Sequence, residues 1–73
     1  MRDDGILKAF GKQLRDLREE KGLSQEKLAE LAGVHRTYQG LIERGRANPT
    51  LLAIVALARA LKVRPAKLLE KLR

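Results

Sequence analysis

Apolar residues recur at helical spacing along almost the whole chain, and no segment shows the sustained alternation of a half-buried β-strand. The first helix is predicted from about Asp4 to Lys21, with Gly22 as its stop. Its apolar stripe consists of Ile6, Phe10, Leu14 and Leu17. Four more helices are predicted, over residues 25–32, 36–44 and 51–62 and from Pro65 to near the C-terminus. The pattern therefore predicts an all-α fold of five short helices in a single domain, residues 1–73.

The second and third predicted helices form a helix-turn-helix unit over about residues 25–44. Ser24 suits the N-cap of the first, because its hydroxyl can accept a hydrogen bond from a free amide one turn on. Gly33 supplies the left-handed residue that a sharp turn needs. The inward face is predicted to carry Leu28, Leu31 and Ala32. A helix about 10–12 Å across fits a DNA major groove about 12 Å wide, so an outward third helix predicts DNA binding.

Charge agrees with this interpretation without deciding it. The chain has 16 Lys and Arg against 9 Asp and Glu, a formal net charge of +7. Such a balance is typical either of a well-solvated surface or of a polyanion partner such as nucleic acid.

Other classes of function lack their chemical signatures in this sequence. There is no Cys, and the single His35 has no ligand cluster around it, so neither disulfides nor a metal site is predicted. Paired carboxylates, a nucleophile beside a His and a phosphate-binding loop are all missing. We therefore expect no enzyme, no cofactor and no small-molecule ligand. No apolar run of about 18 residues and no secretory leader are seen, so we expect a cytoplasmic protein.

Three segments carry a family resemblance: SQEKLAELAGVHRTY from Ser24, ERGRANPT from Glu43 and LARALKV from Leu57. Together they resemble the helix-turn-helix domain of the Cro/phage-repressor (XRE) family, over about Phe10 to Leu69. HRTY and ERGRANPT resemble the controller proteins of bacterial restriction–modification systems in particular. The resemblance implies a lambda-repressor-like fold and a transcriptional regulator that binds double-stranded DNA.

The resemblance also implies roles for individual residues. The residues implied to reach base edges are Arg36, Thr37, Leu41 and Arg44. Those implied to contact phosphates are Gln25, His35, Arg46 and Asn48. Arg18 and Glu43 match a pair that ties the first helix to the third. The alternative is that they are two unrelated surface charges. From chemistry alone, Arg36 could bind guanine O6 and N7 together, His35 could equally cap its own helix, and Gln25 could simply be solvated.

The chain departs from the family pattern at three positions. Gln39 stands where an aliphatic residue is usual, and we expect it to be half exposed. Gly40 inside the helix costs about 1 kcal/mol relative to Ala and either lets DNA approach closely or is a tolerated flaw. These two residues leave the rotation of the recognition helix open. Lys62 replaces the usual Gly at the end of the fourth helix, so the chain there is strained or stops less sharply.

The fourth helix is apolar on more than one face. Its inward stripe is predicted to be Leu51, Ile54, Leu57, Ala58 and Leu61. The apolar residues left over, joined by two from the fifth helix, predict a homodimer interface of Leu52, Val55, Ala56, Leu68 and Leu69. Burial of the whole helix inside its own domain is the alternative. A two-fold dimer predicts a pseudo-palindromic site with half-sites about 34 Å apart. A protein-interaction module or antitoxin with the same fold is the alternative function.

Overall fold

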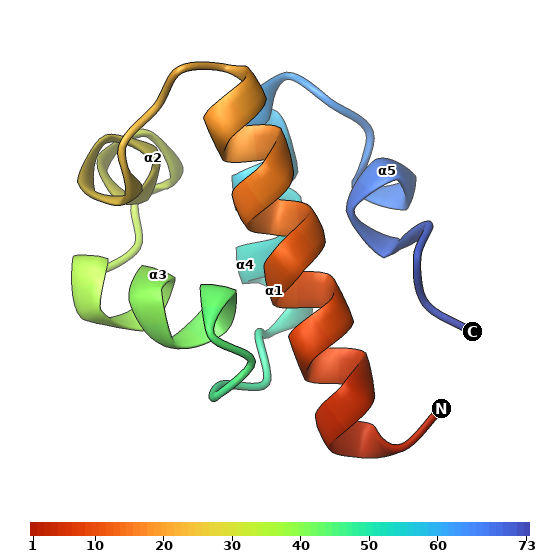
Figure 1. Cartoon of the computed structure of the whole chain (residues 1–73). Helices are drawn as coiled ribbons and strands as arrows, with labels where there is room; N and C mark the ends of the chain where they lie inside the picture. The colour runs from red at the N-terminus through yellow and green to blue at the C-terminus, as the bar shows by residue number, and fades with distance from the viewer.

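The computed structural model describes residues 1–73 and contains five helices and no strands. They are α1 (Asp3–Glu20), α2 (Gln25–Ala32), α3 (Arg36–Glu43), α4 (Leu51–Leu61) and α5 (Pro65–Leu69). In Figure 1 the long α1 crosses the front of the molecule, with α2 and α3 on one side, α5 on the other and α4 behind. The predicted all-α, five-helix architecture is confirmed. None of the five helices combines the length and apolarity that crossing a bilayer would require.

Local signals account for most helix boundaries. The Ser24 hydroxyl accepts a hydrogen bond from the amide of Lys27 at 3.0 Å, and the Thr50 hydroxyl accepts one from Ala53 at 3.1 Å. Pro65 opens α5, where its missing N–H costs nothing. These caps use short polar side chains to satisfy amides that a helix start leaves free.

All five helices contribute to one core. Its nine buried members are Phe10, Leu14, Leu17, Leu28, Ile42, Leu57, Ala58, Leu61 and Leu68. Buried Gln13 fastens α5 to α1, because its amide donates to the Lys67 carbonyl at 3.0 Å and to Glu70 Oε1 at 3.2 Å. Tyr38 ties α3 to the start of α4, since its hydroxyl accepts from the Thr50 amide at 3.2 Å.

Two glycines let α3 lie directly against α1. A Cβ on Gly11 would collide with the carbonyl oxygen of Ile42 and lie 2.5 Å from that of Glu43. A Cβ on Gly45, which follows α3 at φ +72°, would lie 2.8 Å from the Cα of Lys8. The backbones of α1 and α3 therefore touch where larger residues would hold them apart.

Three leucines predicted to be inward or at an interface lie elsewhere. Leu31 is 51% exposed and Leu51 is 73% exposed, so both predictions of an inward side chain are wrong. On α4 the buried positions are Ala53, Leu57, Ala58 and Leu61, a stripe that passes Leu51 by. Leu68 is fully buried in the core and cannot belong to a dimer interface, which corrects the predicted set. Helical period finds apolar stripes, but when a helix is apolar on several sides, packing selects which side is covered.

Lys62 ends α4 in the left-handed conformation, at φ 59° and ψ 41°, and is the only residue other than glycine with positive φ. A side chain in this region is strained by about 1–2 kcal/mol. We therefore expect Lys62→Gly to raise the free energy of unfolding by about 1 kcal/mol, measured by urea denaturation. Lys21→Gly is the control, because Lys21 caps α1 in the right-handed region and gains nothing from glycine. Equal effects of the two substitutions would contradict the strain at Lys62.

Candidate nucleic-acid interface

Two residues shape the turn between α2 and α3: a left-handed glycine and a capping histidine. Gly33 adopts φ 72° and ψ 29° and ends α2. His35 then caps α3, because its Nδ1 accepts a hydrogen bond from the amide of Thr37 at 3.0 Å. Nδ1 must be unprotonated to accept, so in the neutral ring Nε2 carries the proton. The cap therefore leaves an outward N–H on His35 that is free to donate to a phosphate.

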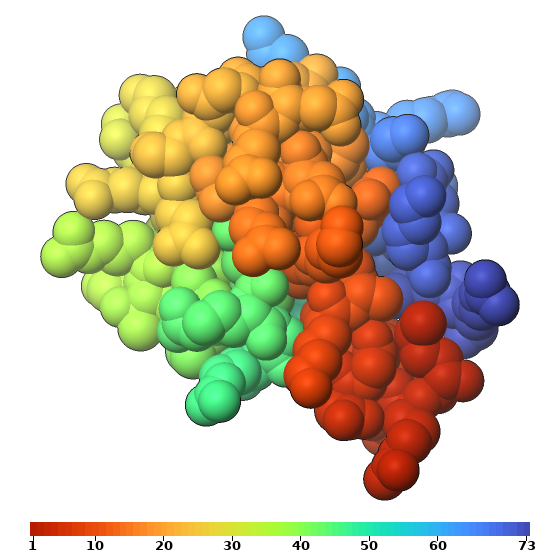
Figure 2. All heavy atoms as spheres, in the orientation of Figure 1, coloured from red at the N-terminus to blue at the C-terminus, as the bar shows by residue number.

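A shallow surface hollow of about 510 Å³ lies between α2 and α3, and no hydrophobic residue lines it. Its lining residues are Ser24, Gln25, Glu26, Arg36, Thr37, Gly40 and Arg44. The side chains of these two helices form one edge of the molecule, the left edge in Figure 2. The fold thus brings together four of the residues predicted to contact DNA, which are Gln25, Arg36, Thr37 and Arg44.

The other predicted contact residues lie around this hollow. His35 lines an adjoining hollow that also includes Glu26 and Arg36. Arg46 and Asn48 are exposed on the loop that follows α3. Leu41 is half-buried and is not part of the lining.

The rotation of α3 is set by the residues on its inner side. Gln39, Ile42 and Glu43 lie at spacings of three and one, and all three are buried. The expectation of a half-exposed Gln39 is wrong, because its side chain is 0% exposed. Gly40 lies at the floor of the hollow, where a Cβ would be 3.2 Å from Nη1 of Arg44. Because Gly40 has no Cβ, the guanidinium of Arg44 can lie close to this turn of α3.

Buried Glu43 is the centre of a polar network beneath the hollow. Its Oε2 accepts from Arg18 Nε and from Gln39 Nε2, both at 2.8 Å. Its Oε1 accepts from Arg18 Nη2 at 3.0 Å and from Gln25 Nε2 at 3.1 Å. The carboxylate thus accepts four hydrogen bonds, about the number that its lone pairs allow. The predicted Arg18–Glu43 pair is present, and it explains why Gln39 is inside: the buried carboxylate needs a further donor.

The network controls the ionisation of Glu43. Burial alone would raise the pKa of this carboxyl, but hydrogen bonds from Arg18, Gln39 and Gln25 outweigh it and lower the pKa below its ordinary value. Glu43 is therefore charged near neutral pH and holds its donors in place. Arg18 also donates from Nη1 to the Leu23 carbonyl at 2.7 Å, which links the end of α1 to the start of α2.

Comparison with known proteins identifies the family. The family model described as a helix-turn-helix domain matches residues 9–72. The chain belongs to this helix-turn-helix family. It is 42% identical over 66 residues to the control protein C.SmaI of Serratia marcescens, covering 90% of this chain and 79% of that protein.

Two solved helix-turn-helix structures show the same fold. The restriction–modification controller protein C.AhdI of Aeromonas hydrophila matches with a TM-score of 0.84 and 52% identity, covering 85% of this chain and 94% of that one. SinR, a master regulator of biofilm formation crystallised in complex with DNA, matches with a TM-score of 0.79 and 36% identity, covering 82% and 97%. The predicted resemblance to repressor-type and controller proteins is confirmed.

Two contacts of this helix-turn-helix unit bear on the predicted roles. Gln25 donates one amide hydrogen to Glu43, so only its second amide hydrogen is available to a phosphate. Arg36 forms an exposed ion pair, with its Nη1 3.2 Å from Oε2 of Glu26. Glu26 was not among the predicted site residues. Its signal in the sequence is its place in the first turn of α2, which the tight turn sets beside the first turn of α3.

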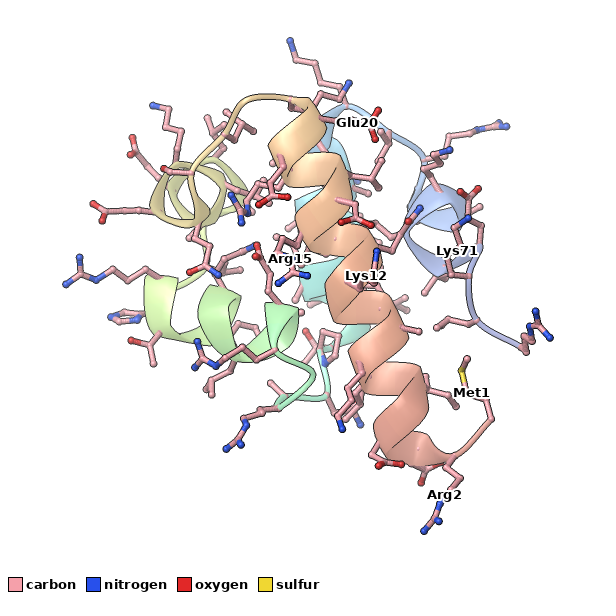
Figure 3. All side chains as sticks on the ribbon, viewed as in Figure 1. Met1, Arg2, Lys12, Arg15, Glu20 and Lys71 are labelled. Atoms are coloured by element: carbon pink, nitrogen blue, oxygen red, sulfur yellow. The ribbon has the colours of Figure 1, made fainter.

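The basic residues of α1 differ in their surroundings. Lys12 and Arg15 extend from the outward side of the helix (Figure 3) and are exposed. Lys12 pairs with Asp16 at 2.8 Å. Arg18, one turn beyond Arg15, is buried against Glu43. Of these three residues only Arg18 belongs to the framework of the helix-turn-helix unit, and Lys12 and Arg15 are solvent-exposed.

Proposed function

We propose that the protein is a sequence-specific transcriptional regulator that binds double-stranded DNA as a homodimer. The observation that carries the proposal is the exposed cluster of Arg36 and Thr37 on α3 with Arg44 at its C-cap. The opposite side of α3 packs against the core. A rigid helix with donors on its outer face suits the major groove. The net charge of +7 favours a polyanion.

The contacts divide by chemistry. We expect Arg36 to bind guanine O6 and N7, and Thr37 and Arg44 to reach base edges beside it. Phosphates are assigned to the free hydrogens of Gln25 and His35 and to Arg46 and Asn48 on the loop. Phosphate contacts set the register of the protein on DNA, while the base contacts select the sequence. Leu41, which the resemblance implies reaches a base edge, is half-buried and lies outside the lining of the hollow, and it stays a proposed base contact.

The dimer is proposed through the outer side of α4. Leu51 and Leu52 are 73% and 82% exposed, and Val55 and Ala56 are half-buried beside them. Leu69 on α5, the other residue predicted for this interface, is 38% exposed. Adjacent exposed leucines are unusual on a monomer and typical of an interface. Two copies joined here would present two recognition helices to successive turns of a pseudo-palindromic site.

Substitution of Arg36 by Ala tests the assignment of base recognition. A site would first be selected from a random DNA pool, and affinities measured for that site and for its variant with the contacted guanine replaced. We expect the wild-type preference for guanine to fall by about 5- to 150-fold, the range expected for a bidentate base contact. Arg64→Ala is the control, because Arg64 is exposed and forms the N-cap of α5, a helix on the other side of α1 from α3 (Figure 1).

If Arg36→Ala and Arg64→Ala weaken binding to both DNAs equally, Arg36 contributes charge and no base contact. A failure to select any sequence would contradict the proposal itself and would favour a protein-interaction role.

Substitution of Leu52 by Lys tests the dimer. A charge in the centre of the apolar face must lose its water in the dimer, so we expect a monomer at concentrations where the wild type is dimeric. Sedimentation equilibrium measures the change. Leu31→Lys is the control, because Leu31 is also exposed but lies on α2. A dimer that survives Leu52→Lys would place the interface elsewhere.

A further inference from the structure

One acidic side chain, that of Glu26, lies among the residues that line the hollow between α2 and α3. Oε2 of Glu26, in the first turn of α2, is 3.2 Å from Nη1 of Arg36, and both side chains are 71% exposed. The two residues line the same hollow as Thr37 and Arg44. A carboxylate is therefore in contact with the one side chain best suited to recognise guanine, on a surface that otherwise attracts phosphate.

Stability does not explain this ion pair. Exposed pairs add little to folding, because water screens both charges and two long side chains must be ordered. The relative position of α2 and α3 is already held by the turn at Gly33 and by the bond between Gln25 and Glu43. We therefore expect Glu26 to act mainly on the contacts that Arg36 makes with DNA.

We propose that Glu26 is a specificity-determining residue that positions Arg36 for a base edge and opposes its contact with phosphate. The proposal rests on the proposed DNA-binding function. A guanidinium has five N–H donors in a planar fork. With one of the Nη1 hydrogens held by Glu26, Nη2 and Nε remain free to donate to guanine O6 and N7.

The same carboxylate has opposite consequences for the two kinds of complex. Non-specific complexes are held almost entirely by phosphate contacts, and Glu26 repels a phosphate that approaches Arg36. In the specific complex the pair already restrains Arg36, so less side-chain freedom is lost when the base contact forms. Glu26 therefore widens the gap between specific and non-specific affinity, although it lowers the positive charge of the surface.

Glu26→Gln tests the proposal in the full chain. Dissociation constants would be measured for the duplex selected from a random pool and for a scrambled duplex of equal length and composition, at two salt concentrations. We expect tighter binding to the scrambled duplex and no gain on the selected one. The ratio of the two affinities should fall by about three- to fivefold, the scale of an exposed ion pair. Circular dichroism would show that the fold is retained.

Glu30→Gln is the matched control, because Glu30 lies on the same helix, is exposed, and pairs with Lys27 at 3.7 Å instead of Arg36. It removes the same charge and should leave the affinity ratio unchanged. The proposal would be overturned if Glu26→Gln and Glu30→Gln changed the affinity for each duplex by the same factor, since only net charge would then matter.

A second comparison uses the Arg36→Ala background, where Glu26→Gln should no longer alter the ratio. A ratio that still falls there would show that Glu26 acts without Arg36 and would also overturn the proposal. A wild-type protein that does not discriminate between the two duplexes is a different result: it would reject the DNA-recognition function itself.

Discussion

Replacement of Arg18 by Met is expected to lower the free energy of unfolding by about 3–5 kcal/mol, because it leaves the buried carboxylate of Glu43 without its cation. Two of the four hydrogen bonds to that carboxylate come from Arg18. Methionine fills much of the same volume, so the loss is mainly electrostatic. Small domains have a total stability of only about 5–15 kcal/mol, and we expect this variant to be partly unfolded at 37 °C. Urea denaturation at pH 7 measures the loss.

Arg15→Met is the matched control for this substitution. Arg15 lies one turn earlier on the same helix and is exposed. The Arg15→Met substitution removes the same charge from the chain but leaves no buried carboxylate without its cation. We expect a change within about 0.5 kcal/mol, as for most surface substitutions. If the two variants were equally stable, the buried pair would contribute no more than a surface charge.

The pH dependence gives a second signature of the same network. The pKa of Glu43 is lowered in the folded protein, so its contribution to stability is complete above the ordinary glutamate pKa of about 4.3. That contribution is lost as the pH falls through the lowered value, because the unfolded chain takes up the proton first. Arg18→Met removes the hydrogen bonds and the charge of Arg18, so burial is then opposed only by Gln39 and Gln25 and the pKa of Glu43 is lowered less than in the wild type. The stability difference between wild type and variant should therefore shrink on acidification.

The parts of the fold that were predictable depend on local chemistry. Helix termini are marked by single residues: Ser24 and Thr50 are the N-caps of α2 and α4, α5 begins at Pro65, and α2 ends at Gly33. Each acts through its own side chain or backbone, so the residues next to it in the sequence are enough to recognise its role. The apolar stripe of α1 was predictable because the helix has one clear apolar face. The family resemblance added the roles of Arg36 and its neighbours, which remain predictions until DNA binding is measured.

The parts that were not predictable depend on partners distant in the sequence. Leu51 and Leu31 are exposed because neighbouring helices cover other sides of α4 and α2. Gln39 is buried because Glu43 needs a donor, and that need is visible only once Glu43 is known to be inside. Glu26 was overlooked for a similar reason, since its partner Arg36 is ten residues away across the turn. Periodicity alone could not locate these residues, because each depends on which surfaces meet.

Gly11→Ala is expected to destabilise the protein by about 1–3 kcal/mol, the usual range for overpacking a well-packed site. The added Cβ would meet the carbonyl oxygens of Ile42 and Glu43. These are backbone atoms and cannot rotate away as a side chain could. Relief requires α3 to move from α1, which would also stretch the hydrogen bonds from Arg18 to Glu43. Thermal and urea unfolding measure the loss, and the affinity for the selected DNA should fall with it.

The control for this prediction lies on the same helix. A Cβ on Gly5 would have only the side chain of Met1 near it, at 3.4 Å, which is an ordinary contact. Gly5→Ala should therefore stabilise the protein by about 0.5–1 kcal/mol, because alanine loses less backbone freedom in a helix. The two substitutions make the same chemical change six residues apart and should move stability in opposite directions. If both were stabilising, α1 and α3 would not be in backbone contact at Gly11, and the recognition helix would be seated differently on the core.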